Sequence, residues 1–122
     1  MHLSSIDKMK YFRDQYLVEK RNEYLKIVDL GSFAIGGSYR DIFNHAAWEY
    51  IGLDLMRGEN VDLVLSDPYN WLEIPSESID VVISGQALEH IEFFWKTMLE
   101  IARIMKPGAL CCLIAPSQGP EH

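Results

Sequence analysis

Short apolar runs recur along this chain and are separated by amphipathic or polar segments. Five of the runs have the length and composition of strands, and they lie at Lys26–Leu30, Glu49–Leu55, Val61–Leu65, Ile79–Ser84 and Ala109–Ala115. The connections between them are helical patterns or long crossovers, which parallel strands require. The pattern therefore predicts an α/β fold with a doubly wound, mostly parallel sheet of about five strands and helices on both faces.

Three segments between or before these runs show a helical pattern. They lie at Ser4–Tyr24, Tyr39–Ala47 and Ile91–Met105. In the first helix, the residues that repeat near helical spacing and are expected to pack on the sheet are Ile6, Met9, Phe12 (or Arg13) and Tyr16. In the last helix, they are Phe94, Met98, Ile101, Ala102 and Met105, and Lys106-Pro107-Gly108 should end it. Tyr69–Ser78 is expected to be a loop, because Pro75 and the Ser and Glu residues disfavour a longer helix.

The sequence KIVDLGSFAIGGSYR, Lys26–Arg40, combines a strand, a glycine-containing turn and the start of a helix. Glycine lets the backbone approach a ligand closely, and the first N–H groups of a helix can donate to it. Asp29, Gly31, Gly36 and Gly37 are therefore candidate residues of a nucleotide cradle, although a plain strand-to-helix turn uses the same residue types. For Asp29 we expect a structural role in orienting the loop.

Two carboxylates follow the next strands. Asp54, with Leu55 beside it, lies at the end of the second run. Its spacing in the sequence from the glycine loop is about that expected of a carboxylate that binds a ribose. Asp67 and Pro68 end the third run, where a carboxylate or backbone N–H can meet an adenine. A strand-end or turn aspartate without a ligand is the competing interpretation at each position.

The segment after the fourth run, Gly85-Gln86-Ala87-Leu88-Glu89-His90, should face the reacting end of a ligand. His90 is a candidate general base, because histidine titrates near neutral pH, and a hydrogen-bonding scaffold residue is the alternative. The aromatic residues Trp71, Trp95 and Phe93-Phe94 are expected to pack inside the protein.

The amino-acid composition and net charge exclude some classes of protein function. The chain has 122 residues, 48% hydrophobic and 24% charged, with a formal net charge of −7. This fits one domain, 1–122, with an N-terminal helix over 1–25, a core over 26–116 and a tail over 117–122. The acidic body argues against a nucleic-acid partner, and no run suggests a signal peptide or a membrane span. We expect a cytoplasmic protein with buried free thiols at Cys111 and Cys112 and without a metal site.

The order of these motifs resembles that of the class I S-adenosylmethionine-dependent methyltransferases. VDLGS, GLD, SDP, IDVVISGQALEHI and IARIMKPGALCCLIAP occur in the order typical of the family, over about Ile27–Pro116. The resemblance implies a Rossmann-like sheet in the order 3-2-1-4-5 that holds S-adenosyl-L-methionine and releases S-adenosyl-L-homocysteine as product. It also implies direct methyl transfer to an acceptor positioned by the protein.

Carried over by residue, the resemblance gives six of the candidates a role. Asp29 and Gly31 would shape the loop beside the methionine part, and Asp54 would bind the ribose hydroxyls. Asp67 would meet the adenine, and Gly85 with Gln86 would line the sulfonium side.

Two departures from the family pattern keep other interpretations open. Phe33 replaces the usual second glycine, and the chain ends after the fifth run, where family members continue with a helix and two strands. The fifth run would then be an exposed edge, which favours a homodimer. We expect a methyltransferase with a small-molecule acceptor. The alternatives are a non-catalytic binding or assembly module left by truncation, and a nicotinamide dehydrogenase, which explains fewer of the motifs.

Overall fold

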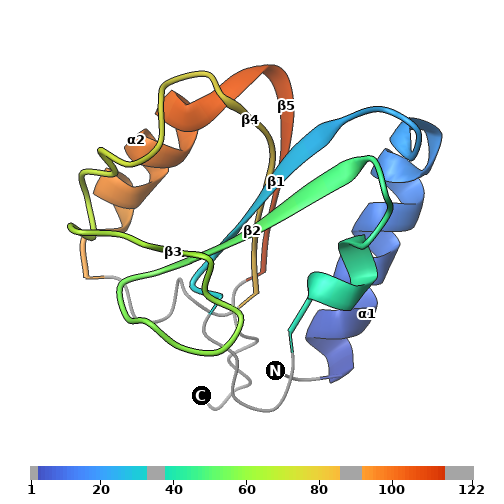
Figure 1. The fold of residues 1–122 in the computed structure, drawn as a ribbon, viewed down its shortest axis with the longest axis horizontal. Coiled ribbons are helices and arrows are strands. Elements are labelled where there is room, and N and C mark those ends of the chain that lie inside the picture. Colours follow the sequence, from blue (N-terminus) through green and yellow to red (C-terminus); the bar gives the residue numbers. More distant parts are fainter. Residues whose placement is uncertain (1–2, 33–37, 86–91, 115–122) are drawn as a thin grey trace.

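A parallel sheet forms the centre of the molecule (Figure 1). The structure is a computed structural model, and it describes residues 3–32, 38–85 and 92–114. The strands are β1 (Leu25–Leu30), β2 (Trp48–Asp54), β3 (Leu63–Val64), β4 (Ile79–Ser84) and β5 (Met105–Leu113). Their order is β3-β2-β1-β4-β5, and every neighbouring pair is parallel. The predicted Rossmann-like fold and strand order are confirmed.

Helical segments cover both faces of the sheet. On one face lie α1 (Leu3–Phe12) and the short helix η3 (Arg40–Phe43), and on the other lies α2 (Phe94–Ile104) (Figure 1). Each face has its own apolar core: Met9, Phe12 and Phe43 belong to the first, and Trp71 and Ile101 to the second. Strands β1 and β4 are almost wholly buried because both faces are covered, which explains why their sequences are continuous apolar runs.

The N-terminal helix is less regular than predicted. After α1 the chain forms a π-helical segment, η1 (Arg13–Leu17), and then a short 3₁₀ helix, η2 (Val18–Lys20). The wider π turn rotates the following residues around the axis. As a result Leu17 is buried in the first core, whereas Tyr16, which the regular period places there, is 58% exposed.

Other element boundaries also differ from the prediction. The helix expected over Tyr39–Ala47 is the four-residue 3₁₀ helix η3, and β3 has two residues rather than the five of Val61–Leu65. Strand β5 begins at Met105, directly after α2, so Lys106-Pro107-Gly108 lies inside the strand. Gly108 has a φ of 83°, and the register with β4 shifts between Ile79 and Val81, so the early part of β5 is irregular.

Helix α2 packs through part of the predicted face: Ile101 is buried, and Met98 and Met105 pack against the second core. Its buried residues are Thr97, Ile101 and Ile104, whereas Phe94 is 44% exposed and Ala102 is also exposed. The crossover before β4 is fastened to this helix at Trp71, whose backbone N–H donates to Glu100 at 2.7 Å and whose carbonyl accepts from Arg103 at 2.8 Å. No helix among the described residues is long and apolar enough to span a bilayer.

Candidate functional site

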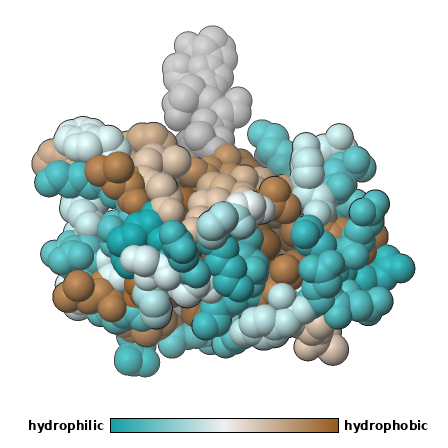
Figure 2. Space-filling view, turned by 90° about the horizontal axis from the view of Figure 1, so that it is seen from above, coloured by the Kyte–Doolittle hydropathy of each residue, from teal (hydrophilic) through white to brown (hydrophobic). Residues whose placement is uncertain are grey.

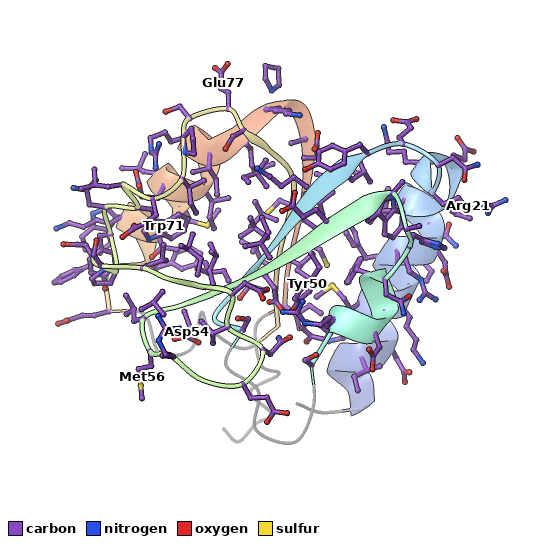
Figure 3. The ribbon with its side chains drawn as sticks, viewed as in Figure 1. Arg21, Tyr50, Asp54, Met56, Trp71 and Glu77 are labelled. Atoms are coloured by element: carbon purple, nitrogen blue, oxygen red, sulfur yellow. The ribbon has the colours of Figure 1, made fainter. Side chains whose placement is uncertain are left out.

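The carboxyl ends of β1, β2, β3 and β4 meet at one edge of the sheet. Leu30 pairs with Leu53, and Asp54 pairs with Val64, so the strands end almost level. Ser84 closes the gap between β4 and β1, because its hydroxyl donates to the Leu30 carbonyl at 3.0 Å. Ligands of doubly wound sheets bind at this edge. Asp54 and Met56 lie at this end of the molecule, and Glu77 lies at the opposite end (Figure 3).

Asp29 is a buried carboxyl group beside the last residue of β1. It is 3% exposed, and the hydroxyl of Tyr50 on β2 donates a hydrogen bond to its Oδ2. Burial raises the pKa of Asp29 to about 7, against smaller lowering effects from the Tyr50 hydrogen bond and the Arg40 charge. Burial and the neighbouring Asp29 likewise raise the pKa of the Tyr50 hydroxyl. This side-chain bond joins β1 to β2, and the role of Asp29 in orienting the glycine loop stays a prediction.

Gly31 begins the turn after β1, and the backbone conformation at this position favours glycine. Its φ is 75°, a conformation that residues with a side chain rarely adopt. The N–H groups of Gly31 and Ser32 both donate to the Leu53 carbonyl, at 2.8 and 2.9 Å. The entry to the glycine-rich segment is therefore held against the end of β2.

A polar network joins this turn to the connection between β2 and β3. Asn60 Nδ2 donates to the Ser32 carbonyl and to Tyr50 Oη, each at 3.0 Å, and Ser32 Oγ donates back to the Asn60 carbonyl at 2.8 Å. Arg40 lies over the Tyr50 ring, donates from Nε to Asn60 Oδ1 at 2.7 Å and pairs with Asp62 at 2.6 Å. Arg40, Asn60 and Asp62 also line an open polar pocket of about 470 Å³.

No motif in the sequence indicates this network. The residues come from three separate segments, and each is an ordinary surface residue type when considered alone. One local signal was available: Asn60 follows Gly58 in a turn, and asparagine is the residue type, after glycine, that most readily adopts its φ of 69°.

Asp54 is the last residue of β2 and is half-buried. Its Oδ1 accepts from the backbone N–H of Leu55 at 2.7 Å, so the carboxylate also stabilises its own turn. Leu55 is 48% exposed and Met56 is 64% exposed. The turn therefore offers both a carboxylate and an apolar surface at the edge of the sheet.

Asp67 and Pro68 follow β3 and are both exposed. Asp67 Oδ1 accepts from the Tyr69 N–H at 2.7 Å, an arrangement typical of an aspartate at a turn. The Pro68 carbonyl accepts from Trp71 Nε1 at 2.9 Å, and Trp71 is buried, as predicted. Trp95, in contrast, is 58% exposed, so the prediction that it packs inside was wrong.

Gly85 is buried directly after β4, and its position admits no side chain. A Cβ atom there would lie 1.8 Å from Tyr39 Oη and 2.5 Å from two ring carbons of Tyr39. Gly36, Gly37, Gln86 and His90 lie outside the described residues. Among the residues described, no group of three or more His, Cys, Asp and Glu side chains is arranged to hold a metal ion.

A family model described as a methyltransferase domain matches residues 28–113. The chain belongs to this methyltransferase-domain family. S-adenosyl-L-methionine is the cofactor of this domain. No curated protein matches the chain.

Solved structures share the fold at low sequence identity. A protein of Methanococcus maripaludis, assigned as an S-adenosyl-L-methionine-dependent methyltransferase, superposes with a TM-score of 0.64 at 14% identity, over 90% of this chain and 62% of its own. A SAM-dependent methyltransferase of Aquifex aeolicus superposes with a TM-score of 0.57 at 18% identity, over 90% of this chain and 71% of its own. MycE, a methyltransferase of mycinamycin biosynthesis solved with Mg and SAH, superposes with a TM-score of 0.57 at 16% identity, over 98% of this chain and 36% of its own. This chain thus spans less than two thirds of the Methanococcus protein.

Proposed function

We propose that this chain binds S-adenosyl-L-methionine at the carboxyl edge of its sheet and transfers the methyl group to a small-molecule acceptor. The observation that supports this most directly is that Asp29, Asp54, Asp67 and Gly85 lie at or near the carboxyl ends of four neighbouring strands. In this proposal residues 1–122 act as one domain. The acidic net charge of −7 favours a small acceptor over a nucleic acid, and two free cysteines fit a cytoplasmic location.

Each site residue has a proposed role, which rests on its environment where the structure describes it and on the family resemblance for Gly36, Gly37 and Gln86. Asp54 accepts hydrogen bonds from the ribose hydroxyls through its carboxylate, and Leu55 covers the adenine ring with its exposed side chain. Asp67 and Pro68 lie beside the adenine in the proposed cofactor site. Gly31, Gly36 and Gly37 let the backbone approach the methionine part, and Gly85 with Gln86 lines the sulfonium side.

Methyl transfer is a direct displacement: the acceptor atom forms a bond to the methyl carbon as the carbon–sulfur bond breaks, and the bonding electrons remain on sulfur. The protein's contribution is mainly to align donor and acceptor. Where the acceptor must lose a proton, we propose His90 as the base. Asp29 is unsuited to that role because it is buried and bonded to Tyr50.

A second candidate function is a non-catalytic binding or assembly module. The observation that favours it is the edge of β5, which has β4 as its one neighbour within the described sheet. Figure 2 looks onto the end of the molecule where β4 and β5 begin, and apolar residues gather in the upper middle of that view. We propose that this edge also mediates a homodimer.

Calorimetric titration of the purified chain with S-adenosyl-L-homocysteine, with NADH as the control ligand, tests the proposed cofactor site. We expect saturable binding of S-adenosyl-L-homocysteine alone. A folded chain that binds neither ligand, or prefers NADH, contradicts the proposal. Binding without methyl transfer from labelled S-adenosyl-L-methionine to any acceptor in a small-molecule panel favours the module instead.

A further inference from the structure

Asn60 makes more contacts than a turn residue needs. Its side-chain amide donates both hydrogens, one to the Ser32 carbonyl and one to Tyr50 Oη, and its Oδ1 accepts from Arg40. Its backbone carbonyl accepts from Ser32 Oγ. Every polar group of the side chain is therefore engaged, and the partners come from the glycine-loop entry, β2 and η3.

The backbone around Asn60 is equally constrained. A Cβ atom on Gly52 of β2 would lie 2.1 Å from the Asn60 carbonyl oxygen and 2.5 Å from Ser32 Oγ. Ser32, Gly52 and Asn60 thus converge on a space without room for another atom. Asp62 adds a further bond to this strand, since its Oδ2 accepts from the Gly52 N–H at 2.8 Å.

The contacts of Asn60 lead to two places at the β1 end of the proposed cofactor site. Toward β1, Ser32 is the last described residue before the glycine-rich segment, and its neighbour Gly31 sits in the left-handed conformation. Toward the sheet, the Asn60–Tyr50–Asp29 series of hydrogen bonds ends on the buried carboxyl group. A residue that touches no ligand can in this way fix the position of backbone groups that do.

We propose that Asn60 is a positioning residue, which locks the entry of the glycine loop onto the connection between β2 and β3 and so preorganises the cofactor site. The proposal rests on the proposed function, because it assigns Asn60 a part in S-adenosyl-L-methionine binding. Preorganisation saves the ligand the cost of fixing Gly31 and Ser32, so losing it weakens binding without removing any ligand contact.

The test separates the side chain of Asn60 from its backbone conformation. Asn60→Gly keeps the left-handed conformation but removes the side-chain bonds, and Tyr50→Phe removes one link of the network. Glu77→Gly is the matched control, because Glu77 is the other described non-glycine residue at positive φ, 53°, and lies at the far end of the molecule (Figure 3). For each variant we would measure the dissociation constant for S-adenosyl-L-homocysteine well below the melting temperature, and amide hydrogen exchange at Gly31 and Ser32.

We expect Asn60→Gly to weaken binding about tenfold and to speed exchange at Ser32, as the loss of one or two hydrogen bonds implies. Tyr50→Phe should show a smaller loss of the same kind, and Glu77→Gly should bind as the original chain does. If Asn60→Gly and Tyr50→Phe lower only the melting temperature and leave the dissociation constant unchanged, Asn60 is a purely structural residue and the proposal is overturned. If the original chain binds no S-adenosyl-L-homocysteine, the proposed function itself fails. In that case hydrogen exchange at Ser32 still reports whether Asn60 holds the loop.

Discussion

The hydroxyl of Tyr50 donates a hydrogen bond to the carboxyl group of Asp29, which is buried between the strands at the carboxyl edge of the sheet. Arg40 stacks on the Tyr50 ring but forms its ion pair with Asp62. The buried carboxyl group therefore has a hydrogen-bond donor beside it rather than a directly paired cation. Burial outweighs that donor, and the pKa of Asp29 rises to about 7.

This raised pKa predicts that the protein loses stability as the pH rises. An acid whose pKa is higher in the folded state than in the unfolded chain binds more protons when folded, so its contribution favours folding at low pH. That contribution is lost between the unfolded value of 3.8 and the folded value of about 7. Through Asp29 alone, the free energy of unfolding should fall by about 2 to 3 kcal/mol between pH 5 and pH 8.

Asp29→Asn should remove this dependence, because the amide keeps the shape and an oxygen that accepts from Tyr50 but does not ionise. Denaturant unfolding at pH 5 and pH 8 measures the difference. Asp7→Asn, which removes an exposed carboxylate from α1, is the control for net charge. An equal change with pH in the original chain and in Asp29→Asn would show that Asp29 titrates as in the unfolded state.

Asp54 is expected to contribute binding energy beyond its role in the turn. Replacing it by Ala should weaken S-adenosyl-L-homocysteine binding by about 1.5 to 3 kcal/mol, because charge-assisted hydrogen bonds to the ribose are lost. Asp54→Asn separates the two roles, since its amide oxygen can still accept from the Leu55 N–H. Compared with Asp54→Ala, we expect Asp54→Asn to recover the melting temperature of the original chain but only part of its affinity for S-adenosyl-L-homocysteine. Full affinity in Asp54→Asn would mean that the residue acts on the turn alone.

Gly85→Ala should destabilise the protein through a direct collision with Tyr39. Tyr39 is 2% exposed and packed in the first core, so its ring has little room to move away from the new Cβ. Overpacking of this kind costs about 1 to 3 kcal/mol. Thermal or denaturant unfolding measures the loss.

A double-mutant cycle with Tyr39→Leu shows where the strain of Gly85→Ala arises. Gly85→Ala should cost clearly less in the Tyr39→Leu background, because the atoms that it meets are gone. Equal costs in the two backgrounds would place the strain elsewhere, in the backbone after β4.

The fold was predictable because β1 and β4 are buried on both faces, which leaves continuous apolar runs in the sequence. The helices were less predictable, because their faces depend on local geometry. A π turn places Leu17 rather than Tyr16 in the core, and α2 buries Thr97, a residue that hydropathy alone does not select. Tertiary packing decides which residues are buried in both helices, and the periodicity of the sequence does not indicate that packing.

The candidate site was predictable only where a single strand end carries the signal. Asp29 lies one residue before the end of β1 and Asp54 ends β2, so the order of the motifs marks both as candidates, and their roles stay predictions. Tyr50, Asn60 and Arg40 act together through contacts between residues far apart in the sequence, so none has a local pattern of its own. They are brought together by the register of β1 against β2 and by the path of the connection from β2 to β3.

The edge of β5 predicts self-association. Along the strand, Cys111 is exposed and Leu110 and Leu113 are only half-buried, while the strand pairs with β4 alone within the described sheet. An unpaired apolar edge is a template for another strand. At high concentration, light scattering should therefore give about twice the chain mass of 14.1 kDa under reducing conditions.

Cys111→Lys tests whether β5 is the interface, because a charge on an edge strand opposes pairing. Cys111→Ser is the matched control: it has similar size, carries no charge and cannot form a disulfide between chains. We expect the dimer to persist in Cys111→Ser and to dissociate in Cys111→Lys, with both variants folded by circular dichroism. A monomer in the original chain, or a dimer that survives the lysine, would show that the β5 edge does not mediate association.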